Sequence, residues 1–197
     1  MPLFLSQNFM KIAITQRETL INDIAHDALD SRWYTLLKKH ELIPIPNTGA
    51  MIPLDFDMLI ISGGEITTQR TETELLYFQM ALLKGIPILG VCHGAFFIND
   101  QFGGTNSTTD GHRNTEHWIL LLGSCRAVKV NSFHNLVIDE LSTDFLIDAR
   151  TAASHLDKDA SIEAFKHKKL PIWGVVWHPE RMITPILPPE LQKLLLC

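Results

Sequence analysis

A cysteine flanked by glycines lies where an apolar segment gives way to a helix-like one. Residues 90–94 are Gly-Val-Cys-His-Gly, directly after the apolar run 86–89 and before Ala-Phe-Phe-Ile at 95–98. A strand that turns sharply at a glycine–x–nucleophile–x–glycine sequence and enters a helix exposes its central side chain at the end of a sheet. The helix N-terminus favours the thiolate form of a cysteine placed there. The pattern therefore predicts that Cys92 is a nucleophile.

A candidate base and an orienting acid lie near the C-terminus. The segment 173–177 is apolar and strand-like, and it is followed by His178, Pro179 and Glu180. A loop that starts at the end of such a strand places His178 over the same sheet edge as Cys92. Glu180 is close enough in sequence to accept a hydrogen bond from one imidazole nitrogen, which fixes the tautomer and stabilises the imidazolium. We expect a Cys92–His178–Glu180 triad.

These segments resemble the class I glutamine amidotransferase-like superfamily, whose members hydrolyse glutamine or γ-glutamyl amides through a cysteine thioester. The segment 60–64, Ile-Ile-Ser-Gly-Gly, agrees with that resemblance. In the superfamily, the equivalent glycine turn and the residue after the nucleophile donate backbone N–H groups to the oxyanion. The resemblance implies Gly64, or Gly63, and His93 as these donors. Glycine allows such a close approach, and preorganised amides stabilise the oxyanion of a tetrahedral intermediate.

Within the superfamily, the similarity is greatest to the γ-glutamyl hydrolases, and it covers roughly residues 10–182. The segments that support this branch are Arg70 with Glu74, residues 87–90, Asn99 with residues 102–104, and residues 131–134. The branch implies that Arg70 anchors a substrate α-carboxylate, which a bidentate guanidinium suits. It also implies that the glutamyl group is bound by Gly63, Asn131, Ser132, Phe133 and His134. The alternatives are a solvated arginine at a helix start and an ordinary loop.

The expected activity is hydrolysis of a γ-glutamyl amide with release of glutamate, and the resemblance extends to a role in bacterial capsule phosphoramidate synthesis. The main alternative is a glutaminase subunit that supplies ammonia to a partner synthase. Synthetase-linked glutaminases usually have a glutamine four residues after the nucleophile, where this chain has Phe96. The segment 92–94 is also similar to the DJ-1/PfpI group, which lacks a distal His-Pro-Glu. A non-catalytic binding module on the same fold is the last alternative.

Composition narrows the class of protein further. The chain has 197 residues, of which 46% are hydrophobic and 20% charged, which is ordinary for a globular domain. We expect one domain over residues 1–197, with residues 1–9 as a disordered or accessory extension. A net charge of −5 gives no basic stripe for nucleic acid, and no apolar stretch is long enough for a membrane span. Three cysteines without a pattern argue against a disulfide framework.

These bounds predict a cytoplasmic enzyme, because a reducing compartment preserves a working thiolate. We expect a small-molecule γ-glutamyl substrate. We expect no cofactor, no bound metal, no nucleic acid partner and no membrane partner.

The elements needed to position the catalytic segments follow from the alternation of strand-like and helix-like runs in the first half of the chain. This alternation predicts an α/β fold, flavodoxin-like, with a mostly parallel sheet and helices on both faces. The expected strands are 11–15, 57–61 and 86–89, with an extended edge segment at 42–46. A first helix is expected after Asp30 and Ser31, and a second one opened by a capping box, Thr71 to Glu74, and ended by Gly85.

The pattern changes after Phe102, where short strand-like runs predict a small antiparallel extension of the sheet. The expected strands are 117–122, 127–130, 145–148 and 161–165. Two segments, 103–116 and 131–140, are expected to be long loops that wall a pocket.

Overall fold

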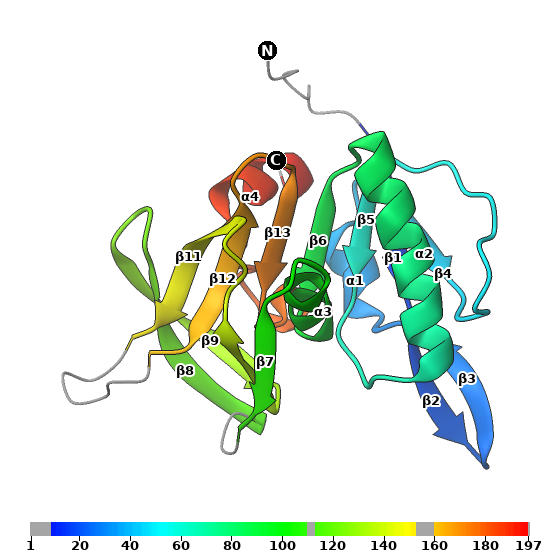
Figure 1. Ribbon diagram of the computed structural model, residues 1–197, viewed down its shortest axis with the longest axis horizontal. Helices are drawn as coiled ribbons and strands as arrows, with labels where there is room; N and C mark the ends of the chain where they lie inside the picture. The colour runs from blue at the N-terminus through cyan, green and yellow to red at the C-terminus, as the bar shows by residue number, and fades with distance from the viewer. Residues whose placement is uncertain (1–8, 110–112, 153–159, 197) are drawn as a thin grey trace.

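A computed structural model of the chain describes residues 9–109, 113–152 and 160–196. Its framework is a nine-stranded sheet in the order β4-β1-β5-β6-β13-β12-β11-β8-β9 (Figure 1). Five neighbouring strands run parallel: β4 (Glu41–Ile45), β1 (Lys11–Thr15), β5 (Met58–Ile61), β6 (Ile88–Val91) and β13 (Ile172–Val175). Four antiparallel strands continue the sheet: β12 (Ile162–His167), β11 (Phe145–Thr151), β8 (Arg113–Leu121) and β9 (Arg126–Phe133). The predicted α/β class, edge strand and antiparallel extension are confirmed.

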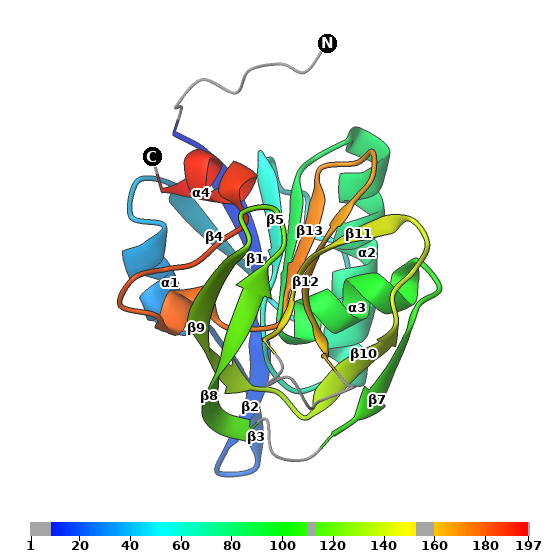
Figure 2. The same ribbon diagram turned by 90° about the vertical axis from the view of Figure 1, so that its left-hand side faces the viewer.

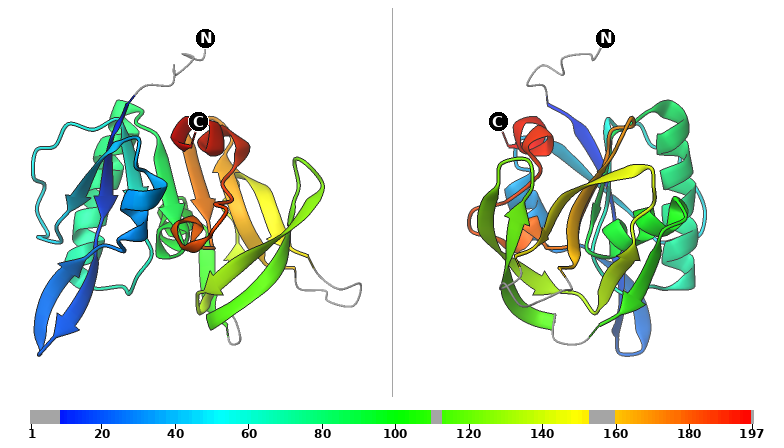
Figure 3. Two further views of the ribbon diagram at one scale, coloured as in Figure 1. Left: turned by 180° about the vertical axis from the view of Figure 1, so that it is seen from behind. Right: turned by 60° about the vertical axis from the view of Figure 1, so that its left-hand side comes forward.

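Helices cover both faces of the parallel half, as predicted (Figures 2 and 3). On one face lie α1 (Arg32–Leu36) and α4 (Pro189–Leu195), and on the other α2 (Thr68–Lys84) and α3 (His93–Gln101). Side chains alternate across β1, so Ile12 and Ile14 pack with Trp33 of α1, whereas Ala13 packs with Tyr77 of α2. None of the helices in the described ranges is long and apolar enough to cross a membrane.

The long helix α2 begins earlier than the sequence predicted. Thr67 is its N-cap, and the Thr67 Oγ1 accepts a hydrogen bond from the amide of Arg70 at 3.3 Å. The predicted capping box at Thr71 is therefore wrong, because Thr71 lies inside the helix and its hydroxyl donates to the Thr67 carbonyl at 2.8 Å. Two threonines four residues apart both suit a cap, and only the fold chose between them. The predicted end at Gly85 is confirmed, with φ +65°.

The two predicted long loops contain strands. β7 (Thr105–Thr108) lies in the segment 103–116 and pairs antiparallel with β10 (Leu136–Glu140) in the segment 131–140. The long strands β8 and β9 also extend into these segments, while residues 110–112 lie outside the described ranges. The strand β7 is Thr-Asn-Ser-Thr and has no apolar side chain, so its period was invisible in the sequence.

A hairpin that the sequence analysis missed projects beyond the end of β1 (Figures 1 and 3). It consists of β2 (Arg17–Ile21) and β3 (Ile24–Ala28), joined through Asn22 and Asp23. These two residues have φ values of 52° and 61°, as in the primed turns that join twisted strands. Asn and Asp tolerate this conformation best among residues with a side chain, which was the available signal. Of the predicted N-terminal extension, only residue 9 lies within the described part of the chain.

Candidate active site

Three adjacent parallel strands end at one edge of the sheet, and each is followed by a predicted catalytic segment. β6 lies between β5 and β13, and Val91 of β6 is in register with Val175 of β13. Cys92 follows β6, Gly63 and Gly64 follow β5, and His178 follows β13. Because parallel strands end on the same side, segments that are far apart in the sequence meet at this edge.

The turn at Cys92 has the strained backbone of a nucleophile elbow. Cys92 has φ 52° and ψ −107°, and α3 begins at the next residue. A Cβ added to Gly94 would lie 2.0 Å from the carbonyl oxygen of Ile61, and one added to Gly90 would lie 2.4 Å from the carbonyl oxygen of Gly94. Any side chain at either glycine would therefore push helix and strands apart. Such strain costs about 1–3 kcal/mol and persists where the surrounding structure enforces it.

The side chains of Cys92, His178 and Glu180 come together in a buried cluster. The Nδ1 of His178 donates to Oε1 of Glu180 at 2.7 Å, and both side chains are almost fully buried. Cys92 and His178 pack against opposite sides of Gly63: a Cβ added there would lie 3.3 Å from Cβ of Cys92 and 2.4 Å from Cε1 of His178. Glu180 lies in a short 3-10 helix, η1 (Pro179–Arg181), which turns its carboxylate back toward the imidazole.

The electrostatics of this cluster favour a protonated imidazole. Burial alone would lower the pKa of His178, but hydrogen bonds with Cys92 and with Glu180, and the charges of both, outweigh it and raise the pKa to about 9. An imidazolium beside a cysteine stabilises the thiolate. The arrangement can therefore hold a nucleophilic sulfur next to a group that is able to donate a proton.

A pocket of about 400 Å³ opens in front of Cys92. Gly64, His93 and His178 line it together with the nucleophile. No hydrogen bond from the amides of Gly64 or His93 is recorded among the described residues, so both N–H groups are available to a ligand. The rest of the wall consists of Arg17, Glu65, Ile66, Phe96, Phe133, His134, Asn135, Leu136 and Arg181.

Of the six residues expected to bind the glutamyl group, only Phe133 and His134 line this pocket. Ser132 is fully buried, and Gly63 lies beneath the triad. The side chain of Asn131 bonds to the main chain of His178 and is thereby directed away from a substrate.

Arg70 requires a correction, because it is neither a solvated arginine nor a group that faces the pocket. Its side chain is fully buried, and its guanidinium donates to the carbonyl of Ser62 at 2.6 Å and to Oε1 of Glu74 at 2.8 Å. It also donates to the carbonyl of Glu65 at 3.3 Å. Position within one turn of a helix start could not reveal this, because α2 starts earlier than expected and turns Arg70 inward.

The sequence analysis missed two arginines of the pocket. Arg17 follows the end of β1 by two residues, at the same edge as the catalytic segments. Arg181 directly follows Glu180, and its guanidinium carbon lies 4.7 Å from the centre of the Phe133 ring. For Arg17, the rule that parallel strands end at one edge was an available signal.

Comparison with known proteins agrees with this geometry. The glutamine amidotransferase class-I family matches residues 22–194. The chain belongs to the class I glutamine amidotransferase family. Family members act on amide carbon–nitrogen bonds, and this amidotransferase-family chain is an enzyme of that kind. Its fold and its relatives support glutamyl amide hydrolysis.

Two relatives cover most of the chain. The γ-glutamyl-CDP-amidate hydrolase of Campylobacter jejuni is 33% identical over 196 residues, which is 87% of this chain and 90% of that protein. The anthranilate synthase component 2 of Saccharolobus solfataricus is 27% identical over 189 residues, covering 90% of this chain and 93% of that protein.

Solved structures show the same fold. A glutamine amidotransferase from Thermotoga maritima has a TM-score of 0.65 at 12% identity, covering 88% of this chain and 77% of the other. A putative GMP synthase component from Thermoplasma acidophilum has a TM-score of 0.64 at 21% identity, covering 89% and 86%. Within the described residues, no group of His, Cys, Asp and Glu side chains is arranged to hold a metal ion.

Proposed function

We propose that the enzyme hydrolyses a γ-glutamyl amide through a thioester on Cys92. The observation that carries this proposal is the packing of Cys92 and His178 against one glycine, with Glu180 bonded to the far nitrogen of the imidazole. In the first step, the sulfur of Cys92 attacks the γ-carbonyl carbon, and the carbonyl oxygen becomes negatively charged. The amides of Gly64 and His93, both at the pocket surface, are the proposed donors to this oxyanion.

His178 then donates its proton to the leaving nitrogen, and the carbon–nitrogen bond breaks. A thioester remains on Cys92, and the amine product leaves. His178, now neutral, takes a proton from a water molecule as that water attacks the thioester. The products are glutamate and the regenerated cysteine–histidine pair. Glu180 keeps the imidazole in one tautomer through both steps.

We infer that the group on the glutamyl nitrogen carries a phosphate. The relative from Campylobacter jejuni, whose name states γ-glutamyl-CDP-amidate as its substrate, supports this inference. Arg17 supports it independently: its side chain lines the pocket beside Gly64, and no hydrogen bond or ion pair of its guanidinium is recorded among the described residues. An unpaired guanidinium in a pocket suits a phosphate oxygen. From the same resemblance we infer a role in capsule phosphoramidate synthesis.

A partner-dependent glutaminase fits this pocket less well. Phe96 occupies the position four residues after the nucleophile, where synthetase-linked glutaminases usually have a glutamine. Its ring is almost fully buried and lines the pocket, so this position offers an apolar wall in place of an amide. We expect hydrolysis to proceed with the purified chain alone.

The test is glutamate release from three kinds of substrate: free glutamine, neutral γ-glutamyl anilides, and γ-glutamyl phosphoramidates including γ-glutamyl-CDP-amidate. We expect the phosphorylated substrates to be the best, and a burst of the first product to reveal the thioester. Cys92→Ala should lower turnover by a factor on the order of 10⁶. Full glutamate release by Cys92→Ala would end the proposal.

A further inference from the structure

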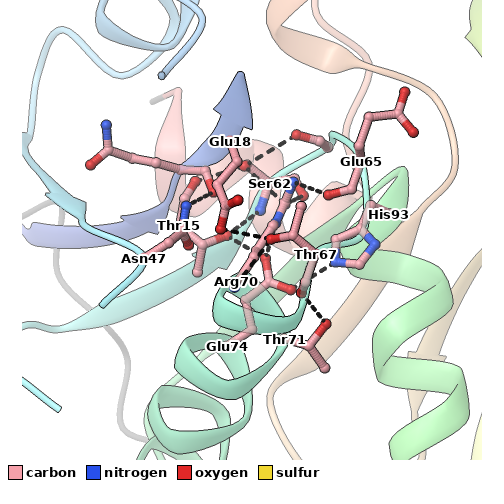
Figure 4. Close-up of polar contacts among 12 residues, drawn as sticks. Thr15, Glu18, Asn47, Ser62, Glu65, Thr67, Arg70, Thr71, Glu74 and His93 are labelled. Carbon is pink, nitrogen blue, oxygen red and sulfur yellow. Dashed lines mark hydrogen bonds and ion pairs between the residues drawn. The ribbon is translucent and has the colours of Figure 1, made fainter. Parts of the chain in front are cut away.

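A buried carboxylate on α2 connects the two segments that supply the proposed oxyanion donors. Glu74 is fully buried, and its two oxygens bond to different partners (Figure 4). Oε1 accepts from Nε of Arg70 at 2.8 Å, whereas Oε2 lies 2.7 Å from Nε2 of His93. One carboxylate therefore joins the first half of α2 to the first residue of α3.

Arg70 continues this connection to the turn after β5. Its Nη2 donates to the carbonyl of Ser62 at 2.6 Å, and its Nη1 donates to the carbonyl of Glu65 at 3.3 Å (Figure 4). These carbonyls flank Gly63 and Gly64, so one guanidinium holds both ends of the glycine turn. The guanidinium also lies directly against this turn, because a Cβ added to Gly64 would lie 2.4 Å from Nη1.

Thr15, at the end of β1, holds the same turn from the other side. Its hydroxyl donates to Oε1 of Glu74 at 2.9 Å and accepts from the amide of Ser62 at 3.0 Å. The hydroxyl of Ser62 in turn donates to the carbonyl of Thr15 at 2.6 Å. Glu74 thus bonds directly to one side chain each from α2, α3 and β1.

The charges in this cluster require an ionised Glu74. Burial alone would raise the pKa of this carboxyl, but the hydrogen bond from His93 and the charge of Arg70 outweigh burial and hold the pKa below its ordinary value. A carboxylate only accepts, so Nε2 of His93 carries a proton, and the ring is fixed in one orientation. Buried ion pairs are a poor way to gain stability, and an apolar cluster could fill this space as well. Their value here therefore lies in geometry.

We propose that Glu74 is a positioning residue that sets the spacing between the amides of Gly64 and His93. It acts through Arg70 on the glycine turn and through the His93 side chain on the start of α3. This inference rests on the proposed function, which gives the two amides their role. Neither Glu74 nor Arg70 lines the pocket, so their effect must pass through the donors.

The first test replaces the charge while keeping the shape. Glu74→Gln should lower kcat for γ-glutamyl p-nitroanilide by about 10²-fold, the cost of misplacing a donor, and leave KM within about threefold. Alkylation of Cys92 by iodoacetamide develops no oxyanion, and its rate should stay within about twofold of the wild type.

The matched control is Glu163→Gln in β12. Glu163 is equally buried and also lies beside a histidine, with Oε2 3.3 Å from Nε2 of His117, but it contacts neither the glycine turn nor α3 in the recorded bonds. We expect Glu163→Gln to lower the melting temperature with kcat within about threefold of the wild type. Equal losses of kcat in the two variants would overturn the inference.

Variants of His93 test the same link with the buried Arg70–Glu74 pair intact. A glutamine can place an N–H donor near the position of Nε2, whereas a leucine fills the space without a donor. We expect His93→Leu to lose kcat to about the same extent as Glu74→Gln, and His93→Gln to recover at least about tenfold of that loss. Equal activity of the two His93 variants would contradict the role assigned to the Glu74 contact.

Amide hydrogen exchange supplies a measurement that needs no turnover. In Glu74→Gln the amides of residues 62–66 should exchange at least about tenfold faster than in the wild type, and in Glu163→Gln at an unchanged rate. Unchanged exchange at residues 62–66 in Glu74→Gln would overturn the inference. A wild-type protein that releases no glutamate from any γ-glutamyl substrate would instead disprove the proposed function, and the exchange comparison would still test the connection.

Discussion

Asn131 grips the main chain of His178 with both ends of its side-chain amide. Its Nδ2 donates to the His178 carbonyl at 2.8 Å, and its Oδ1 accepts from the His178 amide at 2.9 Å. Asn131 lies in β9, at the far edge of the sheet, whereas His178 follows the central strand β13. The antiparallel half of the sheet therefore curves around far enough to fix the backbone of the proposed base (Figure 2).

Replacing this side chain should displace His178 without touching the triad itself. Asn131→Ala removes both hydrogen bonds, and Asn131→Asp keeps the acceptor but loses the donor. We expect kcat to fall by about 10–100-fold in Asn131→Ala and less in Asn131→Asp, with a loss of about 1–3 kcal/mol in the free energy of unfolding. Steady-state kinetics and urea unfolding measure the two effects. Unchanged kcat in Asn131→Ala would show that the grip is irrelevant to catalysis.

A methyl group at Gly63 should separate the nucleophile from the base. The Cβ of Gly63→Ala would lie 2.4 Å from Cε1 of His178, whose ring is held by Glu180. We expect a loss of about 1–3 kcal/mol in stability from overpacking, together with a large loss of kcat. Gly123→Ala is the matched control, because nothing lies within 4 Å of its Cβ position. Thermal unfolding and glutamate release decide, and an active Gly63→Ala would contradict the geometry.

The raised pKa of His178 predicts how stability depends on pH. The pKa is about 9 in the folded protein and 6.5 for an ordinary histidine, so the folded state binds this proton more tightly. The resulting stabilisation, at most about 3 kcal/mol, is fully present below about pH 6.5 and is lost as the pH rises through about 9. Urea unfolding of the wild type and His178→Gln from pH 6 to pH 10 measures it. A constant difference between the two over this range would refute the prediction.

The same proton should limit the activity at high pH. His178 must be protonated to release the leaving nitrogen, so kcat/KM should decline above about pH 9. A pH–rate profile with a substrate that does not titrate in this range measures the decline. Glu180→Gln removes a charge that holds the proton and should shift this limb to lower pH. A limb that stays in place would mean that Glu180 has no influence on the base.

Arg17 should decide how strongly a phosphorylated substrate is preferred. Arg17→Gln removes the unpaired charge beside Gly64, so kcat/KM should fall about tenfold or more further for γ-glutamyl phosphoramidates than for neutral anilides. Arg126→Gln is the control, since Arg126 is exposed at the start of β9 and lies outside the pocket. An unchanged preference in Arg17→Gln would remove the support that this residue gives to an anionic leaving group.

Much of the fold was predictable because the signals were local. The apolar runs of β1, β5, β6 and β13 are each bounded by turn residues, and buried parallel strands have no other pattern to display. The polar strand β7 and the hairpin of β2 and β3 carry few buried side chains, so their pairing depends on partners that a linear pattern does not reveal. The start of α2 was ambiguous because Thr67 and Thr71 are both good caps, and only tertiary contacts select one.

The sequence by itself determined which side chains bear the chemistry: a cysteine between glycines, a histidine and a glutamate two residues apart, and a glycine pair, each placed directly after an apolar strand. A strand that ends in a reactive residue announces itself locally, since both the strand and the turn depend on neighbouring residues. The tertiary structure alone decided what the supporting polar residues do. Arg70 and Asn131 looked like substrate ligands, yet burial directs one to the glycine turn and the other to the backbone of His178. Which partner a long polar side chain finds depends on distant segments, because hydrogen bonds form in space and have no period along the chain.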